Sequence, residues 1–359
     1  MFKKAKIISS LTLVLVLIAS LFGCGSSNTA SQAPSAGANT ASTAKKSGGY
    51  KVALVNSSLG DTYRVQLQAE FVQKADELKS KGVISDYFIT NANGDISKQV
   101  SDMKDMITKK VDGIIIAAVS PSALSPVVEQ AMNAGIKVIS FNMLVDTNNV
   151  TGKVYIDDSE FGRIGAQFLA DKLGGKGNII CLNGTAGNTV NDSRWNGAEK
   201  VFAAHPGMKI VGTSYADWDY AKGKAAVESL LSANPKIDGV WSQGGAMTQG
   251  AIDAFNATGR ELVPMVGEAN NGLLKAWKQN AGKGKFDCIA PSNPAPVSVY
   301  ALNDLISALN GTQFKKDDKL PIQSVTTETL DKYYRPDLPD SFWVFTQLTD
   351  ANLKKLYTK

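Results

Sequence analysis

The sequence has one histidine and three cysteines, and these shortages exclude several kinds of chemistry. His205 is followed by a proline at an expected helix end, so catalytic triads, histidine metal clusters and histidine acid–base schemes lack their main residue. No Gly-x-Ser-x-Gly elbow occurs, and the cysteine spacing fits no zinc site. We therefore expect a protein that is not an enzyme and that uses no cofactor and no metal.

Signals for phosphate and nucleic-acid binding are also weak. Residues 184–187 (Gly-Thr-Ala-Gly) stand between an expected strand and an expected helix, where a phosphate loop would lie, but the P-loop lysine is missing. The formal net charge is +5, and three of the 38 basic residues lie in an expected leader. Without them the chain is nearly neutral, so no nucleic-acid partner is expected.

The first 49 residues have the composition of a leader and a tether. A basic start (residues 1–6) precedes an apolar run (residues 7–19), and Leu21-Phe22-Gly23-Cys24 closes it, which resembles a bacterial lipobox. We expect a signal peptide over residues 1–23, lipid attachment at Cys24 and a flexible tether over residues 24–49. The alternative is an uncleaved anchor helix. Both interpretations place the protein outside the cytoplasm, lipid-anchored to the cell membrane in the first.

The other two cysteines lie in apolar strand runs. Cys181 follows two isoleucines and Cys288 precedes another. The simpler interpretation is two small buried side chains. A disulfide between them is the alternative in an exported protein.

The pattern of strands and helices is clearest over residues 111–143. An apolar run at residues 114–119 stops at Ser120-Pro121-Ser122, a helical repeat follows, and residues 137–141 form a second apolar strand. Such a strand–helix–strand unit implies parallel strands covered on both faces. About five such pairs precede Gly174 and about five follow it. We predict an α/β fold with two similar doubly wound parallel-sheet lobes, followed by a proline-punctuated aromatic tail.

Ligands of open parallel sheets bind beyond the carboxyl ends of the strands. The residues expected there are mostly uncharged amides and hydroxyls, which donate and accept hydrogen bonds and so suit a neutral polyhydroxylated molecule. Aromatic residues lie near the same ends and could stack on a sugar ring. These aromatic residues are Tyr63, Trp195, Trp218 and Trp241.

Several of these residues also have structural alternatives. Arg64 could be solvated at a helix start, Trp218 could cover a sheet edge, and Trp241 lies inside an apolar strand, which favours a core position. Asp61 could be a helix N-cap, and for Asp157 and Asp158 the N-cap is the favoured interpretation.

Residues 50–322 resemble the type I periplasmic binding proteins, specifically the ribose/galactose-like sugar-binding components of ABC transporters. The most specific motifs are Asn56–Tyr63, Asp112–Ile139, Arg194-x-x-Gly197, Ala216–Asp219 and Gln243–Met247.

The resemblance implies a ligand site shared by both lobes. It assigns first-loop contacts to Asp61, Tyr63 and Arg64, a guanidinium to Arg194 and a stacking ring to Trp218. Asn142 stands where relatives have a carboxylate, and Gly244 where they have an asparagine, so a sugar other than ribose, a polyol or another small polar solute remains open. Together with the strand ends, the expected ligand-binding residues are Asp61, Tyr63, Arg64, Asn142, Arg194, Trp218, Gln243, Glu268, Asn270 and Asn293.

The resemblance also implies lobes that close around the ligand on a three-strand hinge, here near residues 155–157, 291–293 and 323–326. The expected lobes are residues 50–155 plus 293–323, and residues 156–292 plus 324–359 with the tail. The expected partners are a small polar solute (a sugar or polyol) and an ABC permease in the membrane, and we expect a monomer. The alternative role is a ligand-sensing co-receptor for chemotaxis or for a membrane sensor kinase.

Overall fold

The computed structural model describes residues 46–358 of the chain. The expected signal peptide, the lipid attachment at Cys24 and most of the tether lie outside the described residues. Over the part that is described, no helix combines the length and hydropathy needed to cross a membrane.

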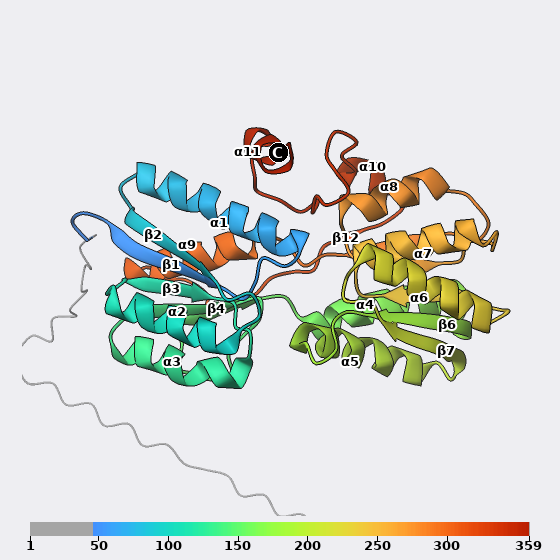
Figure 1. Cartoon of the computed structure of the whole chain (residues 1–359), viewed down its shortest axis with the longest axis horizontal. Helices are drawn as coiled ribbons and strands as arrows, with labels where there is room; N and C mark the ends of the chain where they lie inside the picture. Colours follow the sequence, from blue (N-terminus) through green and yellow to red (C-terminus); the bar gives the residue numbers. More distant parts are fainter. Residues whose placement is uncertain (1–45, 359) are drawn as a thin grey trace, which may run out of the picture. The chain divides into compact units, whose positions relative to one another are not determined.

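The first lobe is built on a six-stranded sheet with the strand order β11-β5-β4-β3-β1-β2, all parallel. Helices α1 and α9 cover one face and α2 and α3 the other (Figure 1), and each face has its own buried apolar cluster. The elements are β1 Tyr50–Asn56, α1 Thr62–Ser80, β2 Ile84–Asn91, α2 Ile96–Thr108, β3 Gly113–Ile116, α3 Pro121–Asn133, β4 Lys137–Phe141, β5 Gly152–Tyr155, α9 Val297–Leu309 and β11 Asp317–Lys319.

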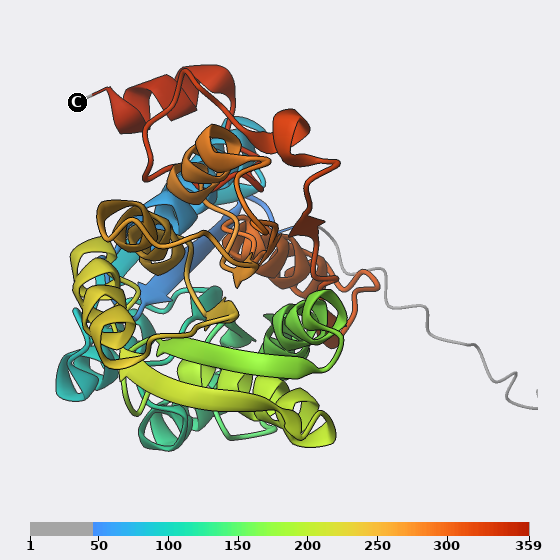
Figure 2. The same ribbon diagram turned by 90° about the vertical axis from the view of Figure 1, so that its right-hand side faces the viewer.

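The second lobe repeats this plan with the order β12-β10-β9-β8-β6-β7, parallel except for the β10–β12 pair. Helices cover both faces of this sheet, α4 and α5 on one and α6, α7 and α8 on the other (Figure 2). The elements are α4 Asp158–Leu173, β6 Lys176–Asn183, α5 Thr189–Ala204, β7 Gly207–Tyr215, α6 Tyr220–Ala233, β8 Gly239–Ser242, α7 Gly245–Ala257, β9 Met265–Val266, α8 Asn271–Asn280, β10 Cys288–Pro291 and β12 Ser324–Val325. The predicted fold of two doubly wound lobes is confirmed.

Two strands are shorter than the apolar runs of the sequence that contain them, residues 114–119 for β3 and residues 262–266 for β9. Strand β3 ends at Ile116 because Ala118 N donates to Met143 O and Val119 N to Gln99 Oε1, so the buried chain has already left the ladder. Strand β9 begins at Met265 because Pro264 has no N–H to donate. A run of apolar residues therefore predicts which residues are buried, but not where the hydrogen-bonded strand begins and ends.

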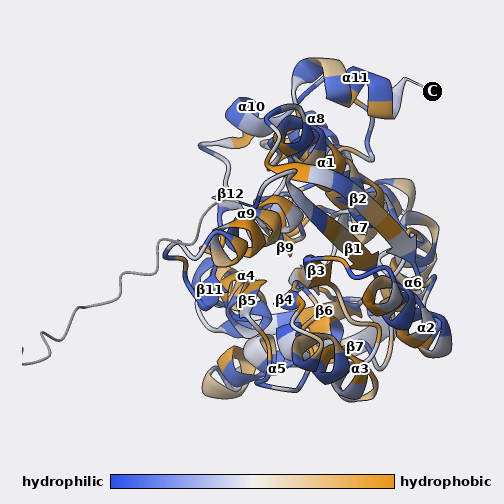
Figure 3. Cartoon of the chain, turned by 90° about the vertical axis from the view of Figure 1, so that its left-hand side faces the viewer, coloured by the Kyte–Doolittle hydropathy of each residue, from blue (hydrophilic) through white to orange (hydrophobic). Residues whose placement is uncertain are grey.

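The buried face of α1 is partly polar, which matters for the tail. The apolar repeat along α1 begins with Val65, yet Val65 is 39% exposed, while Gln66 and Glu70 are fully buried. Figure 3 shows that α1 carries hydrophilic and hydrophobic residues side by side. Two polar residues buried on a surface helix require partners, and these come from the C-terminal tail, which includes α10 (Leu330–Tyr333) and α11 (Asp350–Tyr357).

Cys181 and Cys288 are both free and buried, so they form no disulfide with each other. Burial raises the pKa of both thiols, because the thiolate would lose its hydration. We expect an alkylating reagent to modify neither thiol in the folded protein and both in denaturant, as read by mass spectrometry of the two peptides. Rapid modification of either thiol without denaturant would contradict this burial.

Candidate functional site

Eight of the ten predicted ligand-binding residues are buried although they are polar or carry a hydroxyl. Tyr63, Arg64, Asn142, Arg194, Gln243, Glu268, Asn270 and Asn293 are at most 9% exposed. Polar and charged side chains are rarely buried in such numbers without a functional or structural partner. Asp61 is exposed, and Trp218 is half-buried.

Arg194 on α5 is the centre of the second lobe's share of the site. Its Nε donates to Asp158 Oδ1 at 3.0 Å, its Nη2 to Glu268 Oε1 at 3.0 Å and its Nη1 to Gln243 O at 2.9 Å. The guanidinium also lies over the ring of Phe161, 3.7 Å from the ring centroid. One side chain thus joins the start of α4 to the carboxyl ends of β8 and β9.

Two glycines allow the close helix packing that brings Arg194 to Asp158. A Cβ at Gly162 would lie 1.8 Å from Arg194 O, and a Cβ at Gly197 would lie 1.8 Å from Ser159 O. Any side chain at either position would push α4 and α5 apart. The Arg194-x-x-Gly197 motif is therefore explained by packing as well as by charge.

The buried charges in this region balance. Burial raises the pKa of Asp158 and of Glu268, and the charge of Arg194 opposes that effect. Burial works against the Arg194 cation, but Glu268 and Asp158 outweigh it and raise the pKa of Arg194. Arg64 supplies a second buried cation whose charge reaches Asp158. Two cations against two carboxylates make a site that suits an uncharged ligand.

The first lobe contributes a cluster around Asn142, which follows β4. Asn142 Nδ2 lies 3.3 Å from Tyr63 Oη and 3.3 Å from Asn293 Oδ1. Burial raises the pKa of Tyr63, and charges on Arg64, Glu268, Arg194 and Asp158 also act on it. Three of those four residues belong to the second lobe. The structure therefore brings Tyr63 of the first lobe near Arg194 and Glu268 of the second.

Three of these side chains hold buried polar atoms without a hydrogen-bond partner among the described residues. They are Arg64 Nη1, Asn142 Oδ1 and Gln243 Oε1. Each such atom costs about 1–3 kcal/mol when it is buried unpaired. One is a donor and two are acceptors, which is a pattern that ligand hydroxyls can satisfy because a hydroxyl does both.

Trp218 forms a flat wall between the ends of β6 and β8. Asp217 and Trp218 both have positive φ values, 51° and 56°, which is unusual for so large a side chain. A Cβ at Gly184 would lie 2.2 Å from Trp218 Cε2, and one at Gly244 would lie 2.7 Å from Trp218 Cδ1. Gly184, the first residue of the loop at 184–187, thus makes room for an indole ring, not for a phosphate.

Other predicted residues have structural partners. Asp61 is the N-cap of α1, since Oδ1 accepts from Arg64 N at 2.8 Å, and Asn270 is the N-cap of α8. Trp241 is buried in the core, where it meets the edge of Trp195. Ligand contact by Asp61 and Asn270 stays a prediction.

Sequence reasoning missed two residues of this region. The N-cap interpretation was right for Asp157, which accepts from Glu160 N, and wrong for Asp158, which binds Arg194. Only one of two adjacent aspartates can cap the same helix, so the Asp157-Asp158 pair itself indicated that one of them has another partner.

Trp343 of the tail is the second residue that sequence reasoning missed. Its ring meets the edge of Tyr63 with centroids 5.3 Å apart, and its Nε1 donates to Thr62 Oγ1.

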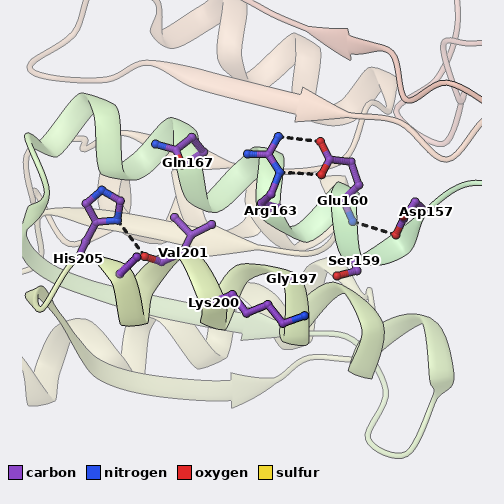
Figure 4. A pocket seen from close by; sticks show the side chains of 10 residues that line it. Asp157, Ser159, Glu160, Arg163, Gln167, Gly197, Lys200, Val201 and His205 are labelled. Atoms are coloured by element: carbon purple, nitrogen blue, oxygen red, sulfur yellow. Dashed lines mark hydrogen bonds and ion pairs between the residues drawn. The ribbon is translucent and has the colours of Figure 1, made fainter. Parts of the chain in front are cut away.

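A separate hollow lies on the outer surface of α4 and α5 (Figure 4). Several of its polar groups are already paired, since Arg163 binds Glu160 through two nitrogens, and His205 Nδ1 lies 2.9 Å from Val201 O. Within residues 46–358 no cluster of three metal-ligating side chains occurs. The hollow therefore offers nothing comparable to the site around Arg194.

A family model described as the periplasmic binding protein domain matches residues 52–313. The chain is 30% identical to the D-allose-binding periplasmic protein of Escherichia coli (strain K12) over 257 residues, 68% of this chain and 81% of that protein. It is 27% identical to the ribose import binding protein of Bacillus subtilis (strain 168), covering 77% of this chain and 87% of that protein.

Two further similarities concern other solutes and the fold. A xylitol-binding protein of Mycolicibacterium smegmatis is 35% identical over 178 residues, 49% of this chain and 51% of that protein. The crystal structure of an ABC transporter solute-binding protein from Thermobispora bispora superposes with a TM-score of 0.73 at 27% identity, covering 82% of this chain and 90% of that one.

Proposed function

The chain belongs to the periplasmic binding protein family, and from this premise we propose that it delivers a small neutral sugar or polyol to an ABC importer. It is a binding protein rather than an enzyme, as its relatives are binding proteins of transporters. The relatives are named for ribose, allose and xylitol, which are uncharged and rich in hydroxyl groups. We propose a ligand of that class.

The observation that carries this proposal is the set of buried, unpartnered polar atoms beside a neutral cluster of charges. Arg64 Nη1 comes from the first lobe, Gln243 Oε1 from the second, and Asn142 Oδ1 from the end of β4. Ligand hydroxyls that satisfy all three would bind both lobes at once, so the ligand favours the closed arrangement. Trp218 would offer its ring to the apolar face of the carbon chain.

The remaining assignments are proposals of the same kind. We propose that Cys24 carries lipid, that residues 24–49 tether the folded body to the cell membrane, and that the protein acts there as a monomer. The lobes would divide at residues 155, 292 and 323, where the chain passes from one sheet to the other.

A thermal-shift panel tests the ligand class. A true ligand at a concentration 100 times its Kd should add about 2.7 kcal/mol to the free energy of unfolding and raise Tm by several degrees. We expect shifts with pentoses, hexoses or their sugar alcohols, and none with their phosphorylated or carboxylated analogues, which carry charge into a balanced site. A phosphorylated sugar that gives the largest shift would contradict the neutral-ligand proposal, and a folded protein that responds to no member would contradict the sugar and polyol class.

A further inference from the structure

The C-terminal tail makes hydrogen bonds to both lobes, to α8 of the second and to α1 of the first. Asn271 of α8 bonds to the tail through its own backbone N, which donates to Phe342 O at 2.7 Å, and through its side chain, which bonds to Arg335 and Leu338. The next residue, Trp343, bonds to α1 of the first lobe. The hydrogen bonds of residues 335–342 thus go to α8 of the second lobe and those of residues 343–349 to α1 of the first.

Three polar residues on one face of α1 hold the tail through its backbone. Gln66 accepts from Trp343 N and donates to Trp343 O, both at 2.9 Å. Gln73, seven residues further along α1, makes a similar pair of bonds, accepting from Thr349 N at 2.8 Å and donating to Gln347 O at 2.7 Å. Between them Glu70 accepts from Gln347 N at 3.1 Å. The spacing of four and three residues is that of one helix face.

This polar face has no other evident purpose. Gln66 and Glu70 are fully buried, and burial raises the pKa of Glu70, although bonds from Thr346 and Gln347 oppose it. Such groups on a surface helix are costly unless every one is paired. The tail pairs them, and its Leu348 and Leu353 are buried in the apolar cluster of the second lobe, against which Ala69 of α1 also packs. The contact is therefore specific and not a loose covering.

The tail also delivers a ring to the ligand site. Trp343 stands edge-on to Tyr63, with an interplanar angle of 76°, and its indole N–H holds Thr62 at the start of α1. Tyr63 in turn lies against Asn142, whose Oδ1 is unpartnered. The position of the tail therefore affects the position of Tyr63.

We propose that residues 343–352 are part of the binding machinery, with Trp343 as a positioning residue for Tyr63 and the tail as a fourth connection that favours closure of the two lobes. The family model ends at residue 313, so this connection lies beyond the part that defines the family. Separation of the lobes requires the tail to leave either α1 or α8. The bonds to α1 therefore add to the stability of the closed arrangement, and the apparent affinity rises with the fraction of closed molecules.

A matched pair of glutamine substitutions on α1 tests the connection. Gln73→Ala removes the reciprocal clamp on the tail, whereas the control Gln68→Ala removes a glutamine of the same helix that binds Asn91 instead. We expect only Gln73→Ala to speed hydrogen exchange in the tail peptide 341–352 and to enlarge the radius of gyration of the ligand-free protein in solution scattering. Equal radii for the two variants, or an unchanged rate of exchange in the tail of Gln73→Ala, would overturn the proposal.

The ligand readout rests on the proposed function and uses the best solute of the thermal-shift panel. Gln73→Ala should weaken its binding about tenfold, which is the effect of losing one or two hydrogen bonds on the closed state. Trp343→Ala should weaken it as well, and Trp343→Phe should restore most of the affinity by keeping the contact with Tyr63. If Trp343→Ala lowers Tm but leaves Kd unchanged, the tail is only a structural cap. If no solute binds the unaltered protein, the proposed function fails, while the scattering and exchange results still decide the connection.

Discussion

Replacement of Arg194 by alanine should lower the free energy of unfolding by about 3–5 kcal/mol and abolish measurable ligand binding. The guanidinium is 2% exposed and ion-paired with Asp158 and Glu268, whose side chains are 12% and 6% exposed. Without it, two carboxylates stay buried close together with no ion-pair partner there. Urea unfolding and calorimetric titration of the ligand measure the two effects.

The pH dependence of this variant separates charge from packing. Burial already raises the pKa of both carboxyls, and loss of Arg194 removes the cation that opposes the rise. A carboxyl with a raised folded-state pKa binds protons more readily in the folded state, so stability falls as pH rises from the unfolded pKa through the folded one. The deficit of Arg194→Ala should therefore be smaller at pH 5 than at pH 8. A deficit that is the same at both pH values would mean that Arg194 acts only by filling space.

Arg163→Ala is the matched control. Arg163 also pairs with a glutamate, Glu160, but its side chain is 47% exposed and that of Glu160 is 42% exposed. Water screens such a pair, so its loss should cost less than about 1 kcal/mol and leave ligand affinity unchanged. Equal losses for Arg163→Ala and Arg194→Ala would remove the distinction between the surface pair and the site.

The repeated strand–helix units predicted the fold because both faces of each parallel sheet are buried, and burial leaves continuous apolar runs in the sequence. The runs also placed Trp218 near the edge where strands end, whereas Arg194, inside α5, was expected at the site from the family resemblance; ligand contact by either residue stays a prediction. The apolar runs could not predict the exact end of a strand, because Ala117 and Ala118 are buried but do not belong to β3.

The tail shows why the remaining part could not be predicted. Its prolines and aromatic residues indicate an irregular packed segment but not the surface to which it returns. The signal lay elsewhere, in Gln66 and Glu70, which interrupt the inner side of α1 and are buried only because Trp343 and Gln347 reach them. A partner at a separation of 277 residues leaves no local pattern to read.

Trp218→Ala should weaken ligand binding by roughly 2 kcal/mol, or about thirtyfold in Kd, with a smaller effect on stability. The Trp218 ring is half-buried and lies at the ends of β6 and β8. Its position follows from the positive φ values of Asp217 and of Trp218 itself. Trp195→Ala is the control, because Trp195 is also half-buried but packs on Trp241 in the core. It should lower Tm and leave Kd unchanged.

A double-mutant cycle of Gly184→Ala and Trp218→Ala tests whether the Trp218 ring contacts Gly184 when the protein binds its ligand. A methyl group at Gly184 would lie 2.2 Å from Trp218 Cε2, so Gly184→Ala alone must displace the indole and weaken binding. In the Trp218→Ala background the same methyl group meets no ring, and the second substitution should change Kd little. Such strong non-additivity is expected only of groups in contact. Additive losses would mean that Gly184 and Trp218 affect the ligand separately, and an unchanged Kd in Trp218→Ala would place the solute elsewhere in the protein.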